Sequence, residues 1–163
     1  MIVATVGTSS IPFDRLLLAL DELGAGEPLF VQHGPSGVRP AGATCVDYLT
    51  HEELTGHMRI ARAVVAHGGV GSILTSLACG RRPIVMPRER GRGEAVDEHQ
   101  LVLARRLARA GVVRLVDTPA DLSAALAEPD GETVRASASA GGLASDLGAY
   151  LRESLGPAAG SRT

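Results

Sequence analysis

The segment from His67 to Ser72 has the residue types best suited to chemistry with phosphate. It reads His-Gly-Gly-Val-Gly-Ser and follows the apolar run 63–66, which is typical of a buried strand. Its three glycines let the backbone approach a ligand closely. The helix expected from about Ser72 points free N–H groups and the positive end of its dipole at the same place. A Ser72 hydroxyl and a His67 imidazole N–H complete a set of donors that suits a diphosphate without a Lys or a tightly held metal. Alternatively, the glycines only form a tight strand-to-helix turn.

The same segment does not match a dinucleotide-binding fingerprint. Gly69-Val70-Gly71 begins a GxGxxG pattern, but Leu74 stands where the third glycine belongs, and no acidic residue follows at the required distance. Binding of NAD or FAD is therefore not expected.

Two polar segments further along the chain are also candidates for ligand contact. The first is 97–100, Asp-Glu-His-Gln, which is either a solvated acidic helix start or a set of hydrogen-bonding groups for a polyhydroxylated ligand. The second contains Arg88, Arg90 and Arg92, which either form a solvated loop or close over a phosphate or a partner.

The composition excludes several classes of protein. The chain has 163 residues, of which 45% are hydrophobic and 2% aromatic, with no Trp and a net charge of −2. This is enough for one compact domain, and it does not favour a base-stacking nucleic-acid surface. All 16 basic residues are arginine, which excludes lysine chemistry.

The cysteines and the hydropathy pattern indicate a cytoplasmic protein. Cys45 and Cys79 are far apart, each in an apolar context, so we expect two reduced core thiols rather than a disulfide or zinc site. The start of the chain is not typical of a signal peptide, and no apolar run approaches the length of a membrane span.

Short apolar runs alternate with amphipathic segments along the chain, a pattern that predicts right-handed βαβ units. Strands are expected at 2–6, 29–31, 44–48, 63–66, 83–87 and 112–116, and helices from Pro12, from Thr50, over 72–79, over 95–110 and over 118–127. The sequence therefore predicts a single Rossmann-like α/β domain with a roughly six-stranded parallel sheet over residues 1–129. We expect a helical extension over 130–155 and a flexible tail over 156–163.

The run from Val64 to Ser72 resembles the donor-binding motif of GT-B nucleotide-sugar glycosyltransferases, with a His-x-Gly-x-x-Ser core at His67, Gly69 and Ser72. Residues 5–9, 32–34, 80–87 and 97–100 resemble, in order, further segments of the family 28 C-terminal domain. The similarity extends to stand-alone small subunits of two-component UDP-sugar transferases, both the eukaryotic dolichol-linked GlcNAc type and bacterial exopolysaccharide types. It also extends to the C-terminal half of peptidoglycan transferases.

This resemblance implies an inverting, metal-independent transfer of a hexose or N-acetylhexosamine from a UDP-sugar to a lipid-linked or polysaccharide acceptor, with no further cofactor. In the family, the acceptor-binding half precedes the donor half, and this chain begins at the donor half. A membrane-anchored acceptor-binding subunit is thus the expected partner, with the chain cytoplasmic or peripheral at the inner face of the membrane. A homodimer is also compatible with the sequence.

The resemblance also assigns roles to individual residues. His67 would act in catalysis by contacting the diphosphate. The other expected contacts to the nucleotide sugar are Gly7, Thr8, Ser9, Gln32, Gly34, Tyr48, Leu49, Gly68, Gly69, Gly71, Ser72, Thr75, His99 and Gln100. Thr75 stands where many members carry a Glu that holds the ribose, which puts nucleotide affinity and identity in question.

Two other functions remain open at this stage. One is a non-catalytic nucleotide-sugar-binding module, and the other is a self-sufficient homodimeric hydrolase or epimerase acting on UDP-sugars.

Overall fold

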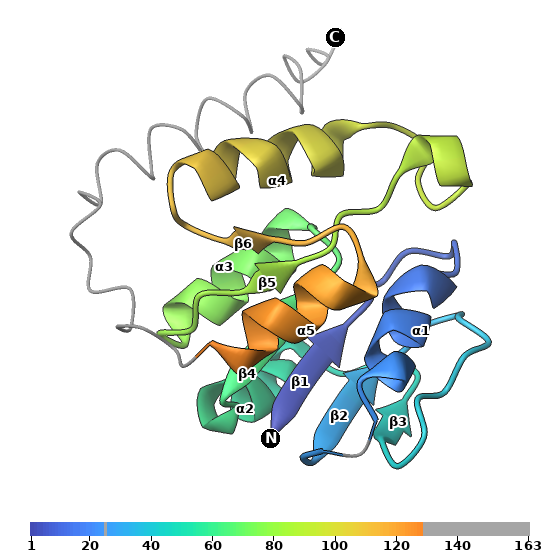
Figure 1. Cartoon of the computed structure of the whole chain (residues 1–163), viewed down its shortest axis with the longest axis vertical. Helices are drawn as coiled ribbons and strands as arrows, with labels where there is room; N and C mark the ends of the chain where they lie inside the picture. Colours follow the sequence, from blue (N-terminus) through green and yellow to red (C-terminus); the bar gives the residue numbers. More distant parts are fainter. Residues whose placement is uncertain (25, 129–163) are drawn as a thin grey trace, which may run out of the picture.

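The computed structural model describes residues 1–24 and 26–128, which form an α/β domain (Figure 1). Its strands are β1 (Ile2–Thr5), β2 (Leu29–Gln32), β3 (Thr44–Val46), β4 (Ala63–Ala66), β5 (Ile84–Val85) and β6 (Arg114–Leu115). Its helices are α1 (Asp14–Glu22), α2 (His51–Ile60), α3 (Val70–Ala78), α4 (His99–Arg109) and α5 (Pro119–Ala127), with a 3-10 turn η1 (Arg90–Arg92).

The six strands form one parallel sheet in the order β3-β2-β1-β4-β5-β6. The strand order reverses between β1 and β4, where Ile2 pairs with Leu29 on one side and with Ala63 on the other. This confirms the expected Rossmann-like sheet. In such sheets ligands bind outside the carboxyl ends of the strands at the point of reversal, so the fold directs attention to the loops that follow β1 and β4.

The strands are buried on both faces, which explains their continuous apolar sequences. Helices α1 and α5 cover one face of the sheet, and α2, α3 and α4 cover the other (Figure 1). Along β4, Ala63 and Val65 pack toward α1 and α5, whereas Val64 packs toward Met58 of α2. This alternation is the period of two that a pleated strand imposes.

Local hydrogen bonds explain where the helices begin. The expected capping box at Thr50 and Glu53 is present at α2, and Thr118 forms a second one with Asp121 at α5. The expectation for α4 was wrong at its start, because the helix begins at His99 and not at residue 95. The Asp97 carboxylate accepts a hydrogen bond from the His99 N–H at 2.9 Å and so defines that boundary.

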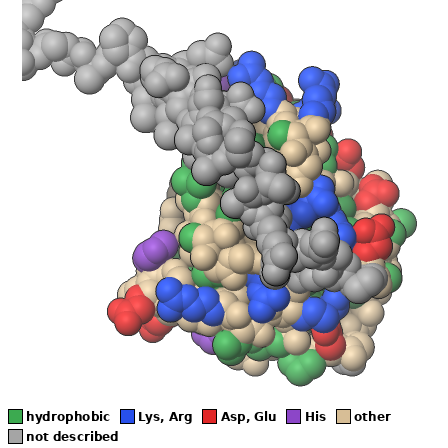
Figure 2. All heavy atoms as spheres, turned by 90° about the vertical axis from the view of Figure 1, so that its left-hand side faces the viewer, with side chains coloured by type: hydrophobic (Ala, Val, Ile, Leu, Met, Phe, Trp, Pro, Cys, Tyr) green, Lys and Arg blue, Asp and Glu red, His purple; other side chains and the backbone are tan. Residues whose placement is uncertain are grey.

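The expected helix at 130–155 and the tail at 156–163 lie outside the described residues. Within the described part, none of the helices has the length and apolar character needed to cross a bilayer. One face of the molecule carries arginine side chains interspersed with hydrophobic and uncharged groups (Figure 2). The two cysteines are free, as expected, and half-buried: Cys45 and Cys79 each pack at the edge of a hydrophobic core cluster and not in its interior.

Candidate functional site

A groove of about 610 Å³ lies at the carboxyl ends of β1 and β4, where the strand order reverses. It is lined by Gly7, Thr8, Gln32, Leu49, His51, Leu54, His67, Gly69, Gly71, Ser72, Leu74 and Thr75. The lining thus combines backbone and neutral polar groups near the strand ends with leucines further out. It contains most of the residues predicted from the sequence.

The imidazole of His67 is held between two glycines. The residue is 8% exposed, and a Cβ atom added at either Gly7 or Gly69 would overlap the ring. Gly7 also has a φ of +77°, which L side chains rarely adopt, whereas Gly69 has an ordinary φ of −68°. At Gly69 the absence of a side chain is therefore required by the histidine ring and not by the backbone.

Burial makes His67 a neutral residue. Desolvation and the nearby Arg88 guanidinium together lower the pKa of His67 from 6.5 to about 4, against a small opposing effect of the Thr5 carbonyl. A neutral imidazole carries a single N–H. Nδ1 lies 3.4 Å from the carbonyl oxygen of Thr5, so a proton on Nδ1 leaves Nε2 as an acceptor. Donation from Nε2 to a phosphate oxygen requires the other tautomer.

Helix α3 begins in the groove without a side-chain cap. Its N-cap is Gly69, and within the described part of the chain this start has no side-chain cap hydrogen bond, in contrast to the capping boxes of α2 and α5. The helix begins at Val70, two residues earlier than expected. The Ser72 hydroxyl donates to the Gly69 carbonyl at 2.9 Å, so it is already engaged within the turn. Gly69, Gly71 and Ser72 of this turn line the groove, and the free N–H groups at a helix start favour an anion.

Leucine side chains make part of the groove apolar. Leu49, Leu54 and Leu74 line it, and the Thr75 hydroxyl donates to the Gly71 carbonyl at 2.8 Å. The sequence did not predict that Leu54, Leu74 and His51 would line this groove. The capping box at Thr50 gives a usable signal for His51, because it places the start of α2 directly after the loop that carries Leu49.

Six predicted residues do not line this groove: Ser9, Gly34, Tyr48, Gly68, His99 and Gln100. Ser9 instead accepts a hydrogen bond from the Ile11 N–H, and Gly34 donates to the Asp47 carbonyl. His99 is 61% exposed beside Asp97 at the start of α4. The roles expected for these residues toward a sugar or base remain predictions.

Arg88 does not lie in a solvated loop and does not reach a phosphate. Its side chain is fully buried and donates to backbone carbonyls, so both readings of its position from the sequence were wrong. Arg90 and Arg92 are exposed, as one of those readings expected. Among residues 1–24 and 26–128, no three His, Cys, Asp or Glu side chains are grouped so that they could hold a metal ion.

Comparisons with known proteins identify relatives of the chain. The glycosyltransferase family 28 C-terminal domain matches residues 25–140. The UDP-N-acetylglucosamine transferase subunit ALG13 of Yarrowia lipolytica is 32% identical over 81 residues, which is 50% of this chain and 37% of that protein.

Solved structures share the fold. The calicheamicin glycosyltransferase CalG4 superposes with a TM-score of 0.61 at 17% identity, covering 96% of this chain and 44% of that one. MurG from Acinetobacter baumannii superposes with a TM-score of 0.51 at 20% identity, covering 76% of this chain and 39% of that one. The chain therefore spans less than half the length of each of these relatives. It has the Rossmann-like fold of one half of a GT-B enzyme, and it belongs to the glycosyltransferase family 28 C-terminal domain family.

Proposed function

We propose that this chain is the donor-binding subunit of an inverting glycosyltransferase that uses a UDP-sugar. The observation that carries the proposal is the uncapped start of α3 in the groove at the strand reversal, next to the backbone of Gly7 and the ring of His67. These groups are neutral or partly positive donors fixed around one space, which suits a diphosphate.

The remainder of the groove suits the nucleoside. With the diphosphate at the start of α3, the ribose lies beside Thr75 and the base reaches the leucines of the outer groove. The relative from Yarrowia lipolytica is a UDP-N-acetylglucosamine transferase subunit, which supports UDP as the nucleotide and a hexose or N-acetylhexosamine as the sugar.

The chemistry required of this groove is stabilisation of a leaving group. An acceptor oxygen attacks the anomeric carbon from the face opposite the diphosphate. The bond from that carbon to the diphosphate oxygen breaks, and UDP leaves with the electron pair. The α3 N–H groups and His67 are placed to stabilise the charge that develops on UDP. Among the described residues, the groove lining contains no Asp or Glu, the usual ligands for Mg²⁺, which supports a metal-independent reaction.

The proton of the acceptor is taken, in this proposal, by a base outside the diphosphate end of the groove. The pKa of His67, lowered to about 4, makes its imidazole a weak base, and the described lining offers no carboxylate. His51, the other histidine of the lining, lies at the start of α2 and not at the start of α3. We therefore place the base and the acceptor site on a second, membrane-anchored subunit that presents a lipid-linked or polysaccharide acceptor. The chain would then work at the cytoplasmic face of the membrane. That the Yarrowia lipolytica relative is itself a subunit supports this arrangement.

Gly69→Ala tests the donor site by calorimetric titration of the purified full chain with UDP in EDTA. The added methyl group must displace the His67 ring, so we expect the Kd for UDP to rise by about tenfold or more through lost hydrogen bonds to phosphate. Gly37→Ala is the matched control, because its Cβ meets open space at an ordinary φ, and it should bind UDP like the unmodified chain. Equal affinity of both variants, or no UDP binding by the unmodified chain, would refute the proposal.

A further inference from the structure

Among the described residues, Arg88 is the largest side chain that is buried completely, with 0% exposure. Its guanidinium donates from Nη1 to the carbonyls of Ile11 at 2.9 Å, Pro12 at 3.1 Å and Glu94 at 3.0 Å, and from Nη2 to the carbonyl of Val6 at 3.0 Å. The Phe13 ring lies against it, with its centroid 4.7 Å from Cζ. All four acceptors are backbone oxygens.

These bonds join the two loops that form the inner groove. Val6 ends the β1 side, directly before Gly7, and the backbone N–H of Arg88 donates to the His67 carbonyl at 3.3 Å on the β4 side. Arg88 is thus hydrogen-bonded both to the loop after β1 and to the loop after β4. The His67 ring has little room between Gly7 and Gly69, so its position depends on the spacing of those loops.

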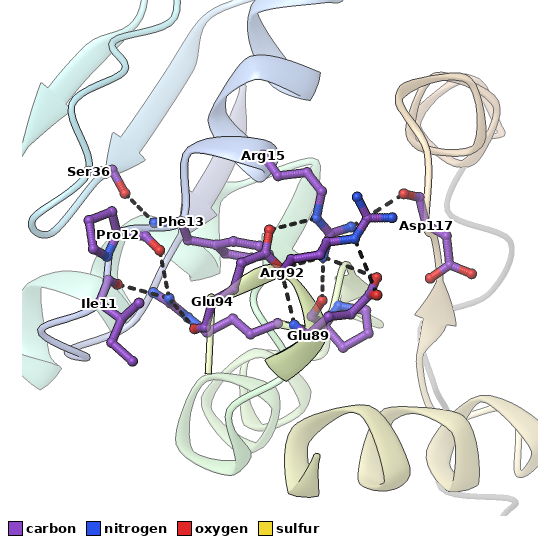
Figure 3. A network of polar contacts seen from close by, with 11 residues as sticks. Ile11, Pro12, Phe13, Arg15, Ser36, Glu89, Arg92, Glu94 and Asp117 are labelled. Atoms are coloured by element: carbon purple, nitrogen blue, oxygen red, sulfur yellow. Dashed lines mark hydrogen bonds and ion pairs between the residues drawn. The ribbon is translucent and has the colours of Figure 1, made fainter. Parts of the chain in front are cut away.

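The segment 87–94 that carries Arg88 is itself fixed to α1. The Glu94 carboxylate is 8% exposed and accepts two hydrogen bonds from Arg15, each at 2.9 Å, and one from the Glu89 N–H at 3.1 Å. Arg15 also donates to the Pro87 carbonyl at 2.7 Å. Figure 3 shows these contacts joining Arg15, Glu89 and Glu94 beside Phe13. The segment is therefore a rigid support for the Arg88 backbone.

Stability alone is a weak reason for this arrangement. A buried cation loses its hydration, and an apolar side chain of similar volume is often equally stable or more stable in its place. Within the described structure, the Nε of Arg88 has no hydrogen-bond partner, so the desolvation of the guanidinium is only partly offset. What the guanidinium provides, and an apolar side chain cannot, is a fixed attachment to four carbonyls on three segments.

We propose that Arg88 is a positioning residue of the donor site, which holds the loop after β1 against the loop after β4 so that Gly7, His67 and the start of α3 face the diphosphate in one geometry. This inference rests on the proposed function. The charge of Arg88 has a second consequence, because together with desolvation it lowers the pKa of His67.

The test measures two quantities on the full chain: the Kd for UDP, and the pKa of His67 from an NMR titration without ligand. Arg88→Met fills the space but removes both the charge and the carbonyl contacts. We expect its Kd for UDP to rise about 10- to 100-fold, as for the loss of one or two hydrogen bonds to phosphate. The pKa of His67 should rise above about 4. Arg88→Lys keeps the charge, so it should weaken UDP binding while the pKa of His67 stays low.

Arg92→Met is the control, because Arg92 lies in the same segment, its side chain is 56% exposed, and the structure pairs it with Glu89. It should change neither quantity. If Arg88→Met folds and binds UDP with the Kd of the unmodified chain, the inference is overturned. If Arg88→Met does not fold, the same result for Arg88→Lys overturns it. Failure of the unmodified chain to bind UDP would instead overturn the proposed function, and the two outcomes are therefore distinguishable.

Discussion

His67 is uncharged at neutral pH, and this limits what it can do. A neutral imidazole offers one hydrogen bond and no ionic attraction, so the attraction for a diphosphate must come mainly from the N–H groups of α3 and the adjacent loops. The burial that makes the ring neutral also fixes its orientation between Gly7 and Gly69. In the proposed reaction, His67 would therefore contribute a single hydrogen bond from a fixed position.

The lowered pKa of His67 predicts a pH dependence of stability. Between pH 6.5 and about 4 the unfolded chain binds a proton at His67 and the folded chain does not, so folding becomes less favourable as the pH falls through this window. The loss attributable to this group is about 3 kcal/mol. Urea unfolding at several pH values should show a smaller decrease for His67→Gln than for the unmodified chain. Parallel curves for the two proteins would contradict the assignment.

At this scale the sequence indicated most of the residues that line the groove, but it did not indicate the buried arginine. His67 and its glycines are adjacent in sequence, so their spacing alone predicts a strand-to-helix turn, and binding of phosphate there stays a prediction. The surroundings of Arg88 depend on the carbonyl of Val6, which is 82 residues away in sequence, and on Ile11, which is 77 residues away. No local pattern predicts such acceptors, and an Arg among Gly and Glu residues resembles an exposed loop.

The described helices differ in how they begin: capping boxes start α2 and α5, whereas α1, α3 and α4 have no side-chain cap at the N-cap residue. Of these three uncapped starts, that of α3 lines the groove. The capping boxes of α2 and α5 were predictable, because their partners lie three residues apart. The start of α4 was harder to predict, because Asp97 binds the backbone two residues on and delays the helix. A short side chain that competes for backbone N–H groups is a common cause of such errors.

Thr118→Ala tests whether a helix cap remote from the groove affects stability without affecting the proposed binding of UDP at the start of α3. Removing the hydroxyl that accepts from the Asp121 N–H should lower the free energy of unfolding by about 1 kcal/mol. The Kd for UDP should not change, because α5 lies on the opposite face of the sheet from α3 (Figure 1). Thr118→Ser keeps the hydroxyl and should unfold at the same urea concentration as the unmodified chain. A changed affinity for UDP in Thr118→Ala would show that the two helices are coupled.

On the scale of the whole molecule, the order of the strands brings the loops after β1 and β4 together. The chain spans less than half the length of the relatives reported above. The sequence allowed this topology to be predicted, since strand and helix signals alternate along it.

We expect the chain alone to bind UDP but to transfer sugar only with an acceptor-binding subunit. In the reconstituted complex, His67→Ala should reduce the rate of transfer on the order of 10²-fold, the usual effect of removing one group that stabilises a leaving group. Initial rates with a lipid-linked acceptor provide the measurement, and Gly37→Ala serves as the control. Rapid transfer by the chain alone would contradict the two-subunit proposal.

The His67 ring occupies the space that a side chain at position 7 or 69 would need, and this affects how the groove could be engineered. Positions 7, 67 and 69 share one space, so a library that varies them singly samples mostly variants with a steric overlap. Alanine at position 69 becomes sterically acceptable once a smaller residue replaces the histidine, because its ordinary φ imposes no further penalty. Measurements of the free energy of unfolding should therefore find sign epistasis between positions 67 and 69, with the paired change less destabilising than Gly69→Ala alone.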